Sequence, residues 1–258
     1  MKTIITTAFL VLGTVVVVVA QTAEELIAEA ITAVGGKENF YNQKDVSYNI
    51  HYKTPPGENA IELKGKETYA FDGELSHCEY TKQSITGASE EGYDGKEFWV
   101  KKEGSLINDQ KAQGVARFLR KTNYYWFAMF FKLQDDGLIY EKLTEQKVNG
   151  KEYNRVKITF KDAIGDTKDT YILYINKETK LIDQFLFTVT GFGITEPSLM
   201  SFDKWETING IKIPTVRKYI NADWEGNIKG KAYVHTNWTN IKFNNGVERS
   251  FFSKAQSK

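Results

Sequence analysis

The fold class is decided by a short stretch of sequence, Asn209-Gly210-Ile211-Lys212-Ile213-Pro214. Its Asn-Gly pair supplies the positive φ angles of a two-residue type I′ turn, which joins antiparallel strands in a hairpin. The same signal recurs between strand-like runs at Asp72-Gly73, Asp94-Gly95 and Asn149-Gly150, and slightly longer hairpin loops are predicted at Asn176 to Lys180 and at Glu225-Gly226-Asn227. Hairpins spread in this way predict about ten to twelve antiparallel strands joined in sequence order, and they exclude a parallel α/β sheet.

The runs beside these turns alternate apolar and polar residues with a period of two. The first covers residues 46–53, where Val, Tyr, Ile and Tyr alternate with polar side chains. Three more runs show largely the same alternation, over residues 61–71, 155–161 and 184–189. This pattern is typical of strands with one buried and one solvated face, which antiparallel sheets permit.

The first twenty residues have the layout of a secretory signal. Lys2 gives a positive start, an apolar stretch runs from Ala8 to Val19, and the small residue Ala20 closes the segment. The apolar stretch is shorter than the roughly 20 residues that span a bilayer, which favours a cleaved signal over a membrane anchor. We therefore expect residues 1–20 to be a signal peptide and residues 21–258 to form one domain outside the cytoplasm.

One helix is predicted directly after this segment. Thr22 and Glu25 have the spacing of a capping box, in which each satisfies a backbone amide at the start of a helix. An apolar stripe follows, and Gly35-Gly36 supplies a left-handed stop. These signals predict an amphipathic helix of about four turns that lies against an apolar surface.

A second helical segment interrupts the strands between Asn108 and Leu133. Asp109 is a plausible N-cap, and apolar residues then follow at helical spacing. The helix continues into residues 124–131, which are apolar or aromatic on every side. A helix with this composition is either buried all round or in contact with an apolar ligand.

Composition and motifs exclude several classes of function. The chain has 258 residues with 34 Lys+Arg against 33 Asp+Glu, so it has no basic field for nucleic acid. One cysteine and three histidines form no zinc motif, and no nucleophile elbow, phosphate loop or His-Glu-x-x-His occurs. Glu90-Glu91 and Asp135-Asp136 are expected in loops as solvated acidic pairs. We expect no cofactor, no metal ion and no catalytic residue.

The aromatic content, 14% of the chain, has two explanations that the sequence leaves open. Bulky rings can simply fill a large core. Alternatively, a curled sheet of around eleven strands encloses more space than the roughly eight strands whose interior side chains can fill, and an apolar cleft remains. The candidate lining and lid of such a cleft are Phe98, Trp99, Tyr124, Tyr125, Trp126, Phe127, Met129, Phe130 and Phe131.

Taken together, these elements resemble the LolA/LolB-like outer-membrane lipoprotein-carrier superfamily. The local stretches that are similar are Ala33-Val34-Gly35-Gly36, Tyr93-Asp94-Gly95 leading to Trp99, the segment from Asn123 to Leu133, Ile175 to Leu181 and Asn209 to Pro214. The resemblance implies an α+β fold, in which one curled antiparallel sheet forms a half-open barrel. An N-terminal helix and a helical insertion would then cover its concave side.

The resemblance also implies a function. Members of that superfamily hold the acyl chains of lipoproteins under helical lids, so a periplasmic, non-enzymatic carrier is expected here. Its partners would be a lipoprotein acyl chain or another lipid-like ligand, together with inner- or outer-membrane partner proteins. Two alternatives stay open: an envelope structural or interaction module whose interior is filled by its own aromatics, and an uncharacterised hydrolase. A hydrolase would need at least two titratable groups that converge inside the cleft.

Overall fold

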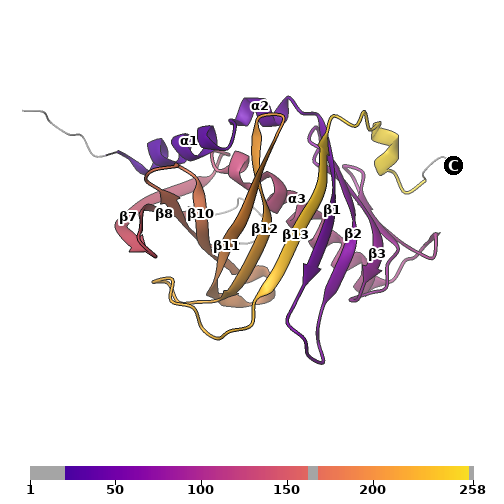
Figure 1. Cartoon of the computed structure of the whole chain (residues 1–258). Helices are drawn as coiled ribbons and strands as arrows, with labels where there is room; N and C mark the ends of the chain where they lie inside the picture. Colours follow the sequence, from indigo (N-terminus) through magenta and orange to yellow (C-terminus); the bar gives the residue numbers. More distant parts are fainter. Residues whose placement is uncertain (1–20, 162–167, 256–258) are drawn as a thin grey trace, which may run out of the picture.

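The computed structural model describes residues 21–161 and 168–255. The predicted signal peptide, residues 1–20, lies outside the described residues. The described part of the chain forms one antiparallel sheet of thirteen strands, with three α-helices against it (Figure 1). The helices are α1 (Ala23–Ala33), α2 (Lys37–Tyr41) and α3 (Gln110–Lys132). The predicted α+β class with a single curled, open antiparallel sheet is confirmed.

The strands fall into two groups along the chain, separated by α3. The first group is β1 (Asp45–Lys53), β2 (Glu62–Ala70), β3 (Leu75–Gln83), β4 (Glu90–Tyr93), β5 (Phe98–Lys102) and β6 (Ser105–Leu106). The second group is β7 (Leu138–Val148), β8 (Lys151–Phe160), β9 (Tyr171–Asn176), β10 (Ile182–Val189), β11 (Ile194–Ile208), β12 (Ile211–Asn221) and β13 (Val234–Phe243). Two short 3-10 helices are also present, η1 (Thr190–Phe192) and η2 (Arg249–Phe252).

The order of strands in the sheet is β6-β5-β4-β3-β2-β1-β13-β12-β11-β10-β9-β8-β7. Each group is therefore a meander, as expected, but the two are joined by a pairing of β1 with β13. The prediction that all strands follow one another in sequence order is wrong at this point. No local signal could show it, because the partners are about 190 residues apart and meet only in the folded sheet.

The four predicted glycine turns all join neighbouring strands, but only two have the positive φ at both residues that a type I′ turn requires. Asn149-Gly150 and Asn209-Gly210 have positive φ at both residues, with values of 48° and 83° and of 51° and 78°. In Asp72-Gly73 and Asp94-Gly95 only the glycine has positive φ. Asp94 instead accepts hydrogen bonds at Oδ1 from two backbone amides of its own loop, at 2.8 and 2.9 Å. This turn is therefore held by hydrogen bonds to the Asp94 carboxylate and not by positive φ at both residues, and its loop is longer than the two residues of a type I′ turn.

Helix α1 begins as predicted and ends against a hairpin of the sheet. Thr22 and Glu25 form both hydrogen bonds of the capping box. The helix has 11 residues, about three turns rather than four, because the chain turns at Gly35-Gly36 and enters α2. Gly35 has φ +114°, and a Cβ added to it would meet the Gly210 carbonyl oxygen at 2.4 Å. The predicted stop is therefore also the place where α1 contacts the β11–β12 turn.

Gly35→Ala is expected to destabilise the protein by about 2–4 kcal/mol, since the new methyl group combines an unfavourable φ with a collision against backbone. Urea unfolding measures this loss. Gly36→Ala is the matched control, because Gly36 also has positive φ, +84°, but nothing lies within 4 Å of its added Cβ. The control is expected to lose only about 1 kcal/mol. Equal losses in the two variants would contradict the contact described for Gly35.

Helix α3 spans the open side of the sheet. In the chain it connects β6 and β7, and these two strands are the opposite edges of the sheet. Asp109 caps it as predicted, accepting a hydrogen bond from the Ala112 amide at 2.8 Å. Figure 1 shows α3 behind the central strands, while α1 and α2 lie along one end of the sheet. The face of the sheet toward α3 is here named the concave face, and the opposite one the convex face.

The main core lies between α3, α1, α2 and the concave face. A smaller apolar cluster lies on the convex face, around Tyr174 and Leu199. Within residues 21–161 and 168–255, no helix combines the length and the apolar character needed to cross a membrane.

Candidate functional site

Most of the predicted lining residues come together on α3 and face the sheet. Five of them are buried in the main core: Tyr124, Phe127, Met129, Phe130 and Phe131. Tyr125 and Trp126 are half-buried and pack against the same core. The predicted aromatic segment thus forms one apolar face of α3, and this face of the helix covers the concave face of the sheet.

The rings of α3 are in direct contact with rings of the sheet and of α2. Phe131 stacks on Phe40 with ring centroids 4.0 Å apart. Phe127 lies 5.1 Å from Tyr48 and 5.2 Å from Trp238, and Trp126 lies 5.0 Å from Phe187. Further pairs link Phe130 to Phe202 and Trp205. Offset and edge-to-face pairs at these separations are attractive, so α3 is held to the sheet by its aromatic side chains.

This packing differs from the open apolar cleft expected from the sequence. The space that a curled sheet of this width leaves on its concave face is occupied by the side chains of α3. A pocket of about 680 Å³ does exist, but it is lined by residues of the convex face and of the β12–β13 connection, including Lys218, Asp203 and Tyr233. The concave apolar surface is therefore covered in this structure.

Phe98 and Trp99 occupy different places. Phe98 stacks on Tyr93 at 4.4 Å, and the guanidinium of Arg117, from α3, lies 5.6 Å from its ring. Trp99 is buried, but its indole nitrogen donates a hydrogen bond to the Phe252 carbonyl oxygen at 2.8 Å. Because adjacent residues of a strand point to opposite faces, Trp99 packs away from α3 and is not brought together with the other candidates.

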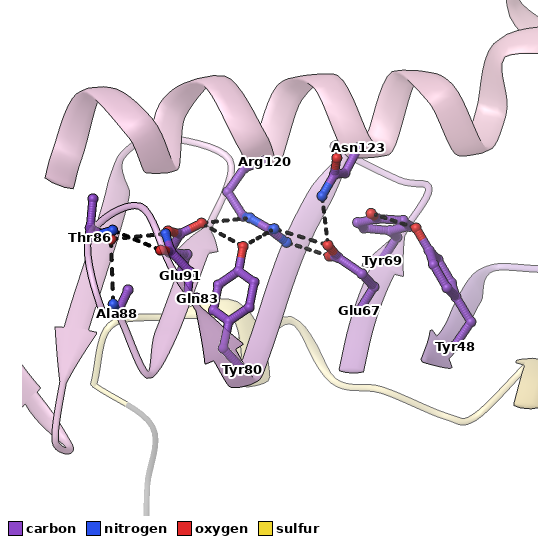
Figure 2. A network of polar contacts seen from close by, with 10 residues as sticks. All are labelled: Tyr48, Glu67, Tyr69, Tyr80, Gln83, Thr86, Ala88, Glu91, Arg120 and Asn123. Atoms are coloured by element: carbon purple, nitrogen blue, oxygen red, sulfur yellow. Dashed lines mark hydrogen bonds and ion pairs between the residues drawn. The ribbon is translucent and has the colours of Figure 1, made fainter. Parts of the chain in front are cut away.

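A buried polar cluster fixes the N-terminal half of α3 to the first meander (Figure 2). At its centre, Arg120 of α3 donates two hydrogen bonds to the Glu67 carboxylate of β2, one of them at 3.0 Å. Asn123, one turn further along α3, donates to the same carboxylate at 2.8 Å. The exposed fraction of the Arg120 and Glu67 side chains is 0%. Both charged groups are thus removed from water and paired with each other.

The second carboxylate of this polar cluster is Glu91 of β4. Its Oε2 accepts a hydrogen bond from the Tyr80 hydroxyl at 2.9 Å, and Gln83 donates to its other oxygen at 3.0 Å. The Arg120 Nε is 3.6 Å away, within ion-pair range. Burial raises the pKa of Glu91, while Arg120 opposes this rise. The prediction that Glu90-Glu91 lies in a solvated loop is wrong, because both residues belong to β4 and Glu91 is completely buried.

The C-terminal end of α3 is held by a half-exposed group of charges. The Lys132 ammonium lies 2.7 Å from the Glu74 carboxylate and 3.1 Å from Asp135, and Asp135 also binds Lys37 at 2.7 Å. These carboxylates raise the pKa of Lys132 although its burial acts to lower it. Asp135 is therefore ion-paired rather than merely solvated, and α3 is fixed at both ends by charge.

The buried titratable groups do not form a catalytic set. Glu67 and Glu91 converge, as a hydrolase would require, but Arg120 and its neighbours bind both of them. Burial raises the pKa of the Cys78 thiol, so the thiol is protonated at neutral pH. Burial lowers the pKa of His77 to about 4, so its imidazole is neutral and only a weak base. In the described part of the chain, no group of His, Cys, Asp and Glu could hold a metal ion.

One further charged residue on the concave face was missed by the sequence analysis. Arg217 of β12 is 3% exposed and points toward α3, where its Nη1 donates to the Trp126 carbonyl oxygen at 3.4 Å. The available signal was its position on the same face of the strand as Ile211 and Ile213. A charged residue on the apolar face of a strand is predicted to be buried, which is rare for a charged side chain.

No protein-family model and no curated protein sequence matches this chain. Solved structures do match over most of its length. A DUF1329 family protein from Desulfovibrio piger is 16% identical, with a TM-score of 0.57, and the match covers 90% of this chain and 98% of that one. A LolA superfamily protein from Nitrosomonas europaea is 13% identical, with a TM-score of 0.57, and the match covers 91% of this chain and 99% of that protein's chain. The chain has a LolA-like fold.

A third structure with this LolA-like fold comes from Vibrio parahaemolyticus. It is a domain assigned to outer-membrane lipoprotein sorting, 10% identical, with a TM-score of 0.56 over 90% of this chain and 98% of that one. At such identities the likeness shows the fold alone. The resemblance seen in the sequence is confirmed at that level, and the function has to be argued from the site.

Proposed function

We propose that this protein is a non-enzymatic carrier or binding protein for acyl chains, with its ligand site on the concave face under α3. The observation that carries the proposal is the position of α3, which joins the two free edges of the sheet and covers the concave face with aromatic rings. Displacing α3 would break no pairing between strands. The LolA-like fold, shared with a domain assigned to lipoprotein sorting, supports the proposal.

In the bound state, the acyl chain takes the place of the α3 side chains against the sheet. Each buried methylene contributes about 0.8 kcal/mol, so a chain of ordinary length offsets much of the contact that α3 gives up. The N-terminal half of α3 stays fixed by the buried pair of Arg120 and Glu67. Its C-terminal half moves, because the acyl chain replaces the ring contacts that hold it and the ion pairs at that end are only half-buried. A membrane partner protein that binds the open state would favour exchange of the ligand.

The cellular location is part of the same proposal. Residues 1–20 act as a cleaved signal peptide, and residues 21–258 form a single domain in the periplasm. The ligand is a lipoprotein acyl chain or another amphiphile.

A second function is favoured by the packing itself. Because the rings of α3 already contact the rings of the sheet, the protein could be an envelope interaction module with a self-filled interior. The two functions differ in one measurable respect, which is whether any lipid enters the concave face.

The test combines extraction with mapping. The full chain is purified from the envelope, its bound lipids are identified by native mass spectrometry, and a fatty acid that carries a diazirine is then photo-crosslinked to it. Labels are expected on concave residues such as Phe185 and Trp238, with few on the convex residues Tyr174 and Leu199. Absence of any bound or accepted lipid, or labelling confined to the convex face, would contradict the proposal and favour the interaction module.

A further inference from the structure

Arg217 lies where the chain otherwise places apolar side chains. Its neighbours on the same face of β12 are Ile211, Ile213 and Thr215 before it, and Tyr219 after it. The strand residue next to it, Lys218, points to the convex face and pairs with Asp203 at 2.8 Å. Adjacent cations of β12 therefore have opposite environments, and only Arg217 is inside the protein.

The charge of Arg217 is not neutralised by the described residues. Two backbone carbonyls are its hydrogen-bond acceptors there, those of Pro214 at 2.8 Å and Trp126 at 3.4 Å, and no carboxylate pairs with it. The titratable groups that act on its charge are Tyr48 and Tyr69. Burial raises the pKa of both tyrosines well above its usual value, so both stay neutral. Burial lowers the pKa of Arg217 to about 9, which still leaves it protonated at neutral pH.

The Arg217 guanidinium stacks on Trp238, whose indole N–H has no hydrogen-bond acceptor among the described residues. Its central carbon lies 3.3 Å from the centre of the Trp238 ring. Trp238 is 3% exposed, and its indole Nε1 donates no hydrogen bond within the described residues. A buried cation and a buried N–H without acceptor are both costly, and cation–π stacking offsets only part of this cost.

We propose that Arg217 and Trp238 bind the anionic head group of an amphiphile, a carboxylate or a phosphate, on the concave face beneath Trp126. This inference rests on the proposed function, since the apolar chain of the same ligand would lie along the rings under α3. The planar guanidinium donates paired hydrogen bonds to either anion, and the indole N–H adds a third.

The same contacts connect the head group to α3. One of the two acceptors of Arg217 is the carbonyl of Trp126, in the part of α3 that the ligand would displace. An anionic oxygen that arrives at the guanidinium replaces this long hydrogen bond with a stronger, charge-assisted one. Ligands without a negative charge supply no such replacement, so the site favours anionic amphiphiles over neutral ones with the same chain.

The experiment compares three ligands that share an oleoyl chain. Oleate carries a carboxylate, oleoyl lysophosphatidate carries a phosphate, and monoolein is neutral; their affinities are measured by displacement of a fluorescent fatty acid from the full chain. The better of the two anions is expected to bind the wild type about 10- to 100-fold more tightly than monoolein. Which anion binds more tightly identifies the head group.

Arg217→Met should remove this preference and leave the affinity for monoolein within about threefold, because the hydrophobic contacts remain. Lys218→Met is the matched control on the neighbouring position and should keep the preference. Trp238→Phe keeps the ring and removes the N–H, so the preference should fall about tenfold. If Arg217→Met does not fold, Arg217→Lys replaces it, and is expected to retain a weaker preference for anions.

The outcomes separate this inference from the proposed function. Equal binding of all three ligands by the wild type, or an unchanged preference in Arg217→Met, would overturn the role of Arg217 while leaving the carrier in place. If none of the three binds the wild type, the proposed function itself is overturned, and this inference with it.

Discussion

Arg120→Met is expected to lower the free energy of unfolding at pH 7 by about 3–5 kcal/mol. The reason is that the substitution leaves Glu67 and Glu91 buried without their counter-ion, and an uncompensated buried charge costs about this much. Urea unfolding measures the loss. Arg117→Met, on the exposed side of the same helix, is the control and is expected to stay within about 1 kcal/mol of the wild type.

The loss in Arg120→Met should depend on pH. Burial already raises the pKa of Glu91, and removal of Arg120 takes away a group that opposes this rise. Glu91 then binds a proton in the folded protein at a pH where the unfolded chain has released it, so the variant gains stability as the pH falls from 7 toward 5. A loss that is the same at pH 7 and pH 5 would show that packing rather than charge holds the polar cluster together.

Phe127→Ala is expected to destabilise the protein by about 3–5 kcal/mol, the usual range for removing a buried phenylalanine ring. Phe127 is 5% exposed, and it packs against Tyr48, Tyr69 and Trp238. Its removal leaves a cavity on the concave face, directly under α3. Thermal unfolding in the absence of ligand measures the effect.

The same variant tests the proposed site. If acyl chains bind under α3, the cavity in Phe127→Ala lowers the cost of entry, and oleate should raise the melting temperature of this variant more than that of the wild type. Phe251→Ala, in the exposed part of η2, is the control and should change neither stability by more than about 1 kcal/mol nor the shift caused by oleate. An equal shift in Phe127→Ala and the wild type would argue against ligand entry at this position.

The sequence predicted the local elements of this fold well because their signals are local. The capping box at Thr22 and Glu25, the cap at Asp109 and the turn at Asn209-Gly210 each involve residues within a few positions of one another. The pairing of β1 with β13 has no such signal, since it depends on the curvature of the whole sheet. The strand β6 was also missed, because two residues are too short for a period to appear.

The site was predictable in its aromatic part and not in its charged part. The aromatic run of α3 is visible as a helix without a polar face, and the structure places it on the concave face; its role as a ligand lining stays a prediction. Glu67 and Arg217 share strand faces with apolar residues, which is a signal of buried charge. Glu67 is ion-paired and Arg217 is not. This difference depends on which residues of other elements lie near each of them in the folded protein, and the strand pattern does not show it.

The pairing of β1 with β13 has a consequence for how this protein is made. During synthesis from the N-terminus, β1 emerges early, but β13, which completes the centre of the sheet, is the last strand to emerge. Until then, β1 and β12 each have an unpaired backbone edge, the kind of edge that promotes aggregation. We expect folding to depend on a chaperone that shields these edges until synthesis of the chain is finished.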